Sequence, residues 1–408
     1  MEPDPFAPQR YVKEAEPLLA AALALWGGTV AEPRAREVTY RPGRSITVAY
    51  DAMVGWNGEE PRRDRLVVRA ARRPLPDVAH VAEDDQGNPV HVFPASRDPM
   101  LPGLARALDT KLVAQLFSDL GIGGAGDEVT LGLRSHRPLR RAVVEANGPS
   151  GRLFLKVVTP ASVEDLHRRH RLLEGVVPVP NSLGWTPDGI VVLPTLPGRT
   201  LRQAIADGDE VPRLEEVVAL LDRLPTELTQ LPGARSAPAA MGEHVRLLST
   251  VLPPAAARLE AVSQGISEIL GEQEDPGPVV AAHGDLYESQ LMVESGRIVG
   301  LLDIDGAGAG LRIDDMANLI GHLSVVSRAR GWQRAEQIGA QWIDLLDTRP
   351  DVDPVTLRAR VAAVVLGLAT GSFRVQEDQW PRHTYTRLNL AEAWLGSARR
   401  AANSPAGR

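Results

Sequence analysis

The segment AAHGDLYESQ, Ala281–Gln290, follows the apolar run GPVV and leads into the strand-like run QLMV. An acid placed in a turn directly after a strand puts its carboxylate where the chain leaves a sheet. Gly284 permits backbone angles that other residues avoid. The pattern makes Asp285 a candidate catalytic base, and an ordinary loop carboxylate is the alternative.

Two strand-like runs after this turn, QLMV and IVGLLDI, surround the turn ESGR and predict a hairpin. A hairpin brings its outer ends together, so we expect Asp285, Gln290 and Asp303 to converge at one edge. Two carboxylates and an amide oxygen suit a hard cation such as Mg²⁺, which keeps several waters and bridges phosphates. We also expect His283 to hold the turn by a hydrogen bond.

Composition narrows the possible classes of protein. The 408 residues are 43% hydrophobic with a formal net charge of -7, and basic and acidic residues alternate along the chain. This pattern predicts a globular protein of two or three domains with a small-molecule partner, and it does not indicate nucleic acid or membrane binding. The chain has no cysteine. Its N-terminus lacks a signal-peptide pattern, so we expect a cytoplasmic location.

Lysine is rare in this chain. It occurs only at Lys13, Lys111 and Lys156, although Lys and Arg together number 45. Lys156 lies within the apolar run RLFLKVV, where a compact ammonium cannot be exchanged for the planar arginine fork without changing what it binds. The sequence therefore predicts an anionic partner for Lys156, and a solvent-facing position on an edge strand is the alternative.

The first half of the chain contains a divergent internal repeat. Arg41-Pro42-x-Arg44 corresponds to Arg137-Pro138-x-Arg140, and RLVVRA corresponds to RLFLKV, which puts Arg69 in the place of Lys156. We therefore expect a first copy that acts as a cap. Helical patterns dominate from about residue 202. The expected domains are an α/β cap at 1–125, an antiparallel-sheet lobe at 126–198 and a helical lobe at 199–408.

Three motifs together resemble the aminoglycoside phosphotransferase family, whose fold is similar to that of protein kinases. They are HGDLYESQ, LLDID followed by DDMANL, and RLFLKVV upstream. The resemblance covers roughly residue 131 to the C-terminus and implies an α+β, bilobal fold. It also implies a catalytic Asp285, Mg²⁺ held by Gln290 and Asp303, nucleotide phosphates at Lys156, and a catalytic loop braced by His283 and Asp315. Pro194, Thr195 and Leu196 would line the adenine slot by analogy.

Two positions depart from the family pattern. Most members have Asn where this chain has Gln290, and the bacterial maltokinases and glucosamine kinases, which carry an N-terminal cap, also resemble the present pattern. The helix glutamate that should pair with the lysine falls near His170, which leaves Glu164 or Glu174 as substitutes.

Several acids also have plain structural interpretations. Asp303 could cap a turn, and Asp314 or Asp315 could be N-caps of the following helix. We expect His322 to be structural, and Asp305 is the weaker candidate for a second metal.

The resemblance implies an ATP- or GTP-dependent kinase that phosphorylates a hydroxyl of a sugar, an amino sugar or an aminoglycoside-like compound. Glu377 and Asp378 could meet a cationic amine and Trp380 could stack on a sugar face, whereas a solvated loop is the alternative for all three. A catalytically silent nucleotide-binding scaffold is the alternative function, and the sequence leaves the oligomeric state open.

Overall fold

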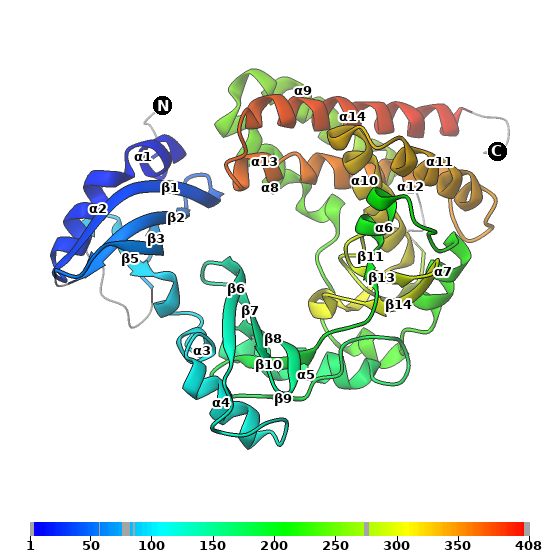
Figure 1. The fold of residues 1–408 in the computed structure, drawn as a ribbon. Coiled ribbons are helices and arrows are strands. Elements are labelled where there is room, and N and C mark those ends of the chain that lie inside the picture. The colour runs from blue at the N-terminus through cyan, green and yellow to red at the C-terminus, as the bar shows by residue number, and fades with distance from the viewer. Residues whose placement is uncertain (1–3, 57, 76–81, 85, 273–276, 404–408) are drawn as a thin grey trace. The chain divides into compact units, whose positions relative to one another are not determined.

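The computed structural model describes the chain except for residues 1–3, 57, 76–81, 85, 273–276 and 404–408. The chain divides into two compact units, which are described separately below (Figure 1). The first contains Met1–Glu164, Leu183–Pro194 and Ser372–Trp380, and the second contains Asp165–Ser182, Thr195–Gly371 and Pro381–Arg408.

The first unit contains two antiparallel sheets with the same strand order. The first sheet is ordered β1-β2-β3-β5-β4, from strands β1 (Gly28–Arg41), β2 (Ser45–Trp56), β3 (Arg62–Ala71), β4 (Ala82–Glu83) and β5 (Pro89–Pro94). The second is ordered β6-β7-β8-β10-β9, from β6 (Thr130–Arg137), β7 (Arg141–Gly148), β8 (Gly151–Val158), β9 (Gly184–Trp185) and β10 (Ile190–Pro194). The matching order supports the internal repeat that the sequence predicts.

The strand registers match as well. Val48 lies opposite Val68 in the first sheet, and the corresponding Val144 lies opposite Leu155 in the second. One residue further along, Arg69 on β3 and Lys156 on β8 occupy the same place in their sheets. At this one position in the register, the first sheet therefore carries an arginine and the second carries a lysine.

A pair of helices precedes each sheet. Helices α1 (Pro8–Lys13) and α2 (Ala15–Ala24) precede the first, and α3 (Gly103–Ala107) and α4 (Thr110–Asp119) precede the second. The apolar residues of α3 and α4 share one core with β7, β8 and β10. The expected boundary at residue 125 separates these helices from the sheet on which they pack. We call residues 4–94 the first repeat and residues 98–194 the second repeat.

A buried aspartate holds the first hairpin of the second repeat. Asp98 Oδ2 accepts the Leu139 N–H at 2.7 Å and lies 3.0 Å from His136 Nε2, while Asp98 Oδ1 accepts the Met100 N–H at 3.0 Å. Leu139 has a φ of 64°, a left-handed conformation that costs free energy for a residue with a side chain. The hydrogen bond from its amide helps to hold that conformation.

Asp4 has the corresponding place in the first repeat. Its Oδ2 accepts the Gly43 N–H at 2.7 Å and the Tyr40 hydroxyl at 2.6 Å, and its Oδ1 accepts the Phe6 N–H at 2.9 Å. Gly43 has a φ of 68°, so the turn conformation is retained and glycine adopts it without strain. The repeat therefore extends to the aspartate, the turn and the hydrogen bonds between them.

The second unit is mainly helical. Its helices are α6 (Leu201–Asp207), α7 (Leu214–Asp222), α8 (Ala237–Val251), α9 (Ala256–Gly271), α10 (Arg312–Arg330), α11 (Gln333–Asp347) and α12 (Pro354–Leu368), together with most of α14 (Trp380–Ala402). Helices α5 (Pro160–Leu173) and α13 (Gly371–Arg374) each have residues in both units. Short 3₁₀ helices occur at Ala95–Arg97, Thr226–Gln230, Pro253–Ala255 and Ile304–Gly306.

Two small sheets complete the second unit. Strands β11 (Arg199–Thr200), β13 (Leu291–Glu294) and β14 (Arg297–Leu301) form one, and β12 (Val279–Ala282) pairs with β15 (Gly308–Leu311) in the other. The predicted hairpin is confirmed as β13–β14, with Leu291 opposite Leu301.

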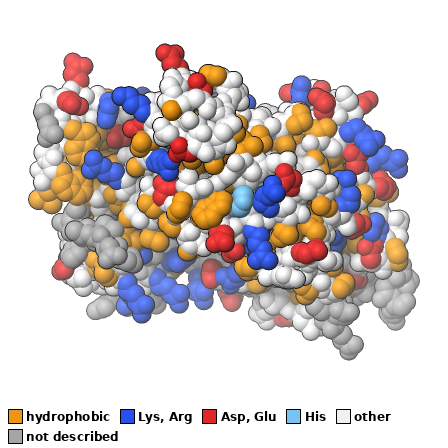
Figure 2. Space-filling model, turned by 90° about the horizontal axis from the view of Figure 1, so that it is seen from below, with side chains coloured by type: hydrophobic (Ala, Val, Ile, Leu, Met, Phe, Trp, Pro, Cys, Tyr) orange, Lys and Arg blue, Asp and Glu red, His pale blue; other side chains and the backbone are white. Residues whose placement is uncertain are grey.

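The stretch Pro354–Arg374, which contains α12, is long and apolar enough to cross a membrane by length and composition, with a mean hydropathy of 1.3. Buried residues make up 78% of its apolar window, as expected of a core helix, so it is weak evidence for a membrane span. On the molecular face shown in Figure 2, acidic and basic side chains are interspersed among hydrophobic ones.

The two aspartates that hold the hairpins form a matched pair for mutation. We expect Asp98→Ala to lower the free energy of unfolding by about 3–5 kcal/mol, because it removes a fully buried partner of His136. Asp4→Ala should cost about 1–2 kcal/mol, because Asp4 is only partly buried. Urea unfolding of both variants measures the difference. Equal losses below 1 kcal/mol would show that these carboxylates do not hold the turns.

Candidate active site

The loop at residues 283–290 connects β12 to β13, and hydrogen bonds to the Asp315 side chain hold its start in place. This side chain, in the first turn of α10, is completely buried. Its Oδ2 accepts the His283 N–H and its Oδ1 accepts the Gly284 N–H, both at 2.8 Å. Burial raises the pKa of Asp315, while these two backbone N–H groups and Arg312 favour its charged form. Asp315 thus braces the loop directly.

Gly284 fits its position because it has no side chain. Its φ is 82°, and a Cβ atom there would lie 2.7 Å from the carbonyl oxygen of Gly306. The loop therefore turns tightly against the segment that follows β14.

His283 is buried with both ring nitrogens engaged. Its Nε2 lies 2.9 Å from the Leu302 carbonyl oxygen, and its Nδ1 accepts the Asp285 N–H at 3.3 Å. These partners require a neutral ring that carries its proton on Nε2. The geometry suits positioning of Asp285 rather than proton transfer by His283 itself.

Two neighbours of Asp285 anchor the rest of the loop. The Tyr287 ring stacks on His322 of α10, with ring centroids 4.3 Å apart. Glu288 is fully buried, and its Oε1 accepts a hydrogen bond of 2.7 Å from Arg202 Nε of α6. The Arg202 backbone N–H also donates to the Glu288 carbonyl oxygen. Two helices of one unit, α6 and α10, therefore hold this part of the loop.

Gln290 and Asp303 lie at the open end of the β13–β14 hairpin, just beyond the pair Leu291–Leu301. The Leu302 N–H donates to the Gln290 carbonyl oxygen at 2.8 Å, which places Asp303 one residue away from this bond. Asp303 has a left-handed φ of 52° and occupies the N-cap position of the 3₁₀ helix Ile304–Gly306, without a side-chain capping hydrogen bond. Burial raises the pKa of the Tyr287 hydroxyl, and the charges of Asp285 and Asp303 raise it further, so both carboxylates lie near this phenol.

The donor set fits a magnesium ion. Within the described ranges, no three His, Cys, Asp or Glu side chains gather as a cluster able to hold a metal. Mg²⁺ needs no such cluster, because it binds proteins through one or two carboxylates and fills its other positions with water and phosphate oxygens. The Asp303 carboxylate and the buried Gln290 amide are oxygen ligands of the required kind.

The other predicted residues are distributed between the two units. Lys156 is only 8% exposed and lies between Val143 and Val191 in the second sheet. Pro194 ends β10 in the first unit, whereas Thr195 and Leu196 begin the next segment of the second.

The remaining candidates have partners of their own. Trp380 belongs to the first unit, as do Glu377 and Asp378, and its ring lies edge-on to Phe373 at 5.1 Å. Of the two candidate partners of Lys156, Glu174 forms an ion pair with Arg171. His170, at the family-like position, is buried with its Nδ1 2.7 Å from the Pro180 carbonyl oxygen.

Sequence reasoning missed the ion pair between Glu288 and Arg202 and the anchoring role of Arg169. Arg169 donates hydrogen bonds to the carbonyl oxygens of Ala307 and Pro232, at 2.8 and 2.9 Å, and so ties α5 to the segment after Asp303. The available signal for Glu288 was its charge, because it lies between the motif residues Asp285 and Gln290 of the loop. For Arg169, the helical pattern gives no indication of its buried partners.

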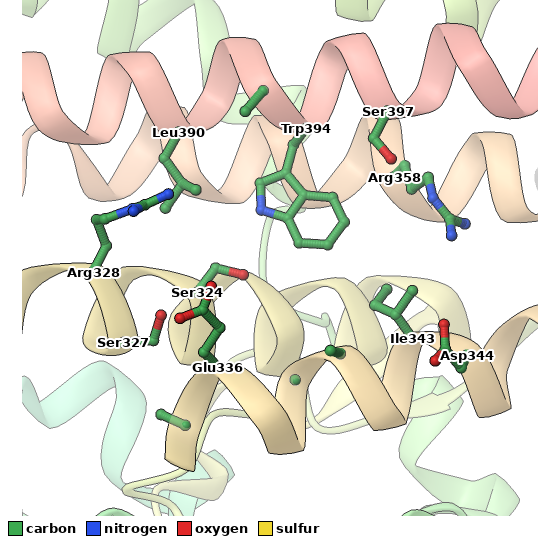
Figure 3. Close-up of a pocket in the computed structure, with 14 residues that line it drawn as sticks. Ser324, Ser327, Arg328, Glu336, Ile343, Asp344, Arg358, Leu390, Trp394 and Ser397 are labelled. Carbon is green, nitrogen blue, oxygen red and sulfur yellow. The ribbon is translucent and has the colours of Figure 1, made fainter. Parts of the chain in front are cut away.

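A cavity of about 360 Å³ lies between α10, α11, α12 and α14 of the helical unit (Figure 3). The Trp394 indole faces it from α14, and Ser324 and Glu336 face it from α10 and α11. Ser324 follows Asp315 by nine residues, or about two and a half helical turns. None of the predicted site residues lines this cavity.

Comparison with known proteins identifies the family. The model of the phosphotransferase enzyme family matches residues 138–355, which is more than half of the chain. The chain therefore belongs to the phosphotransferase enzyme family, and its fold is the α+β, kinase-like fold with an additional N-terminal sheet. No curated protein sequence matches the chain significantly.

Solved structures of several phosphotransferases are similar to this chain. Choline kinase from Cryptosporidium parvum is 12% identical, with a TM-score of 0.50, and the match covers 73% of this chain and 99% of that one. A macrolide 2′-phosphotransferase from Brachybacterium faecium is 21% identical, with a TM-score of 0.41 and coverages of 69% and 98%. A variant of the aminoglycoside phosphotransferase APH(4)-Ia, in ternary complex with AMP-PNP and hygromycin B, is 16% identical, with a TM-score of 0.49 and coverages of 70% and 98%.

The His322 side chain predicts a pH dependence of stability. Burial lowers the pKa of His322 to about 3, and the charges of Arg202 and Arg387 add to this effect. The unfolded chain binds a proton below about pH 6.5, whereas the folded chain does not bind it until about pH 3. The contribution of the neutral His322 ring to the free energy of unfolding is therefore fully present above pH 6.5. It falls as the pH drops toward 3, by at most about 1.4 kcal/mol per pH unit.

We expect His322→Phe, which keeps an aromatic ring beside Tyr287, to remove this contribution. Between pH 7 and pH 5, the wild-type free energy of unfolding should fall by about 2 kcal/mol more than that of the variant. Urea unfolding at both pH values measures the two changes. The same fall in both proteins would mean that His322 is protonated equally in the folded and unfolded chains.

Proposed function

We propose that this protein is an ATP-dependent kinase that transfers the γ-phosphoryl group to a hydroxyl of a sugar, an amino sugar or an aminoglycoside-like compound. The observation that supports this most directly is that Asp315 clamps the loop that carries Asp285, while the Gln290 carbonyl oxygen accepts the Leu302 N–H next to Asp303. In the reaction, the acceptor oxygen forms a bond to the γ-phosphorus and the bond to the β-phosphate oxygen breaks. ADP leaves, and Asp285 takes the hydroxyl proton.

The roles of the other residues follow from their chemistry. Asp285 is held through its own backbone by His283, so its carboxylate can orient the acceptor hydroxyl. Asp303 and Gln290 would hold Mg²⁺, which neutralises charge on the phosphates. Lys156 would contact the nucleotide phosphates. The backbone at Pro194, Thr195 and Leu196 would face the base, and GTP is the alternative nucleotide.

Two features support a sugar or amino sugar as the acceptor. The N-terminal cap and Gln290 are the two features in which the sequence resembles the bacterial maltokinases and glucosamine kinases. Glu377 and Asp378 would attract an amine, and Trp380 would offer a ring face to a sugar. A nucleotide-binding scaffold without activity is the alternative that Gln290 motivates.

ATP consumption in the presence of a panel of sugars, amino sugars and aminoglycosides tests this function. We expect one acceptor class to stimulate turnover, and Asp285→Asn to reduce kcat by about two or more orders of magnitude with nucleotide affinity nearly unchanged. Glu294→Gln, an exposed acid at the end of β13, is the control and should keep full activity. ATP binding without turnover for any acceptor, unchanged in Asp303→Ala, would favour the scaffold.

Gln290 allows a separate test of the metal site. Gln290→Ala removes an amide oxygen, so we expect the Mg²⁺ concentration for half-maximal activity to rise about tenfold with the acceptor KM unchanged. Gln290→Asn should restore part of the loss. Titration of activity with Mg²⁺ measures both variants. An unchanged Mg²⁺ requirement in Gln290→Ala would exclude this side chain as a ligand.

A further inference from the structure

The first sheet carries a row of polar side chains at the place that corresponds to Lys156. In register, the row consists of Thr39 on β1, Thr47 on β2, Arg69 on β3 and His91 on β5. The corresponding row of the second sheet is Ser135, Val143, Lys156 and Val191. The first repeat thus keeps a cation at this place, has Thr39 where the second has Ser135, and adds one hydroxyl, Thr47, where the second has Val143.

The second repeat brings a further cation to this face. Residues at odd positions of β3 share one face of the sheet, and on it Ala49, Val67 and Phe93 form a small apolar cluster. Leu139, at the tip of the β6–β7 hairpin, packs against this cluster. Arg140 follows Leu139 directly in this hairpin, and the charge of Arg41, which is two residues from Thr39 on β1, acts on it.

The electrostatics agree with this placement. Burial lowers the pKa of Arg69, and the charge of Arg41 lowers it further. Burial also lowers the pKa of Arg140, which is then lowered by Arg137, Arg141 and Arg41 and opposed by Glu37. We call Arg41, Arg69 and Arg140 the arginine cluster. Like charges repel one another there, and the acid Glu37 opposes this effect at Arg140.

Other arginines of these sheets have carboxylates of their own. On the same face as Arg69, Arg36 and Arg65 both bond Asp51 at 2.9 Å through their Nε atoms. In the second sheet, hydrogen bonds from Arg134, Asn147 and Arg152 hold the pKa of Glu145 at about 2.

Over the residues that the structure describes, no member of the arginine cluster has a carboxylate within 4.0 Å. Arg69 donates only to the Arg73 carbonyl oxygen, at 3.4 Å. The sheets therefore pair some of their arginines with carboxylates, and among the described residues the arginine cluster forms no ion pair.

We propose that the arginine cluster binds a small anion that carries two or more phosphate groups. Guanidinium groups bind phosphate oxygens by paired hydrogen bonds. Thr39 and Thr47 stand in the same row as Arg69 and can donate their hydroxyl protons to the same anion. A ligand that spans Arg69 and Arg140 would join the two repeats, because each contributes one of these side chains. All three arginines belong to the first unit, and binding at this site needs no acceptor.

Binding of inorganic triphosphate, measured by titration calorimetry without Mg²⁺, tests the site. The full chain carries Lys156→Met in every sample, so that the predicted nucleotide lysine does not contribute. We expect Arg69→Ala and Arg140→Ala each to weaken binding about tenfold or more. Arg62→Ala removes the same charge from the opposite face of β3 and should change the affinity less than twofold. Competition by ATP assigns the site to nucleotides, and lack of competition assigns it to inorganic polyphosphate.

Three results would overturn the proposal. They are the absence of triphosphate binding, binding that is unchanged in both cluster variants, and an equal loss in Arg62→Ala, which would indicate diffuse charge. Arg69→Gln keeps a polar side chain and serves as a second variant if Arg69→Ala fails to fold. Since no turnover is measured, a negative result here is distinguishable from failure of the proposed kinase activity.

Discussion

The arrangement of the catalytic loop depends on one buried carboxylate that accepts two consecutive backbone N–H groups. Burying a charge is costly unless hydrogen bonds compensate it, and Asp315 receives this compensation from His283 and Gly284. The same two bonds fix the loop that carries Asp285. Because the partners are main-chain groups, substitution of His283 could not remove them. The position of the loop is therefore determined by the protein interior before any ligand binds.

Local patterns explain what could be predicted from the sequence. The β13–β14 hairpin follows from two apolar runs around a turn, and the lysine strand follows from one lysine within the run RLFLKVV. The parts that could not be predicted depend on distant partners. Arg202 and Glu288 are 86 residues apart, and Arg169 bonds a carbonyl oxygen 138 residues away. Such pairs leave no periodic pattern, because one buried ion or one backbone acceptor requires only a single side chain.

The full extent of the internal repeat could not be predicted from the sequence either. Sequence similarity indicated the strands, but Asp4 and Asp98 act through turn geometry that different residues satisfy. Gly43 adopts the left-handed conformation without strain, and Leu139 is held in it while its side chain packs on the other sheet. The backbone conformation was retained while the residue changed, and the change gave the second hairpin an apolar contact.

The continuity of each repeat bears on how the chain is made. Asp98 follows Asp4 by 94 positions, and the helix pair, hairpin and aspartate of the first repeat all precede the second repeat. At about 5–20 residues per second, the ribosome needs roughly 5–20 s to synthesise the second repeat. During that time the first repeat can complete its own hydrogen bonds. It would then present a finished sheet to the emerging hairpin, so that Leu139 finds its apolar contact already formed.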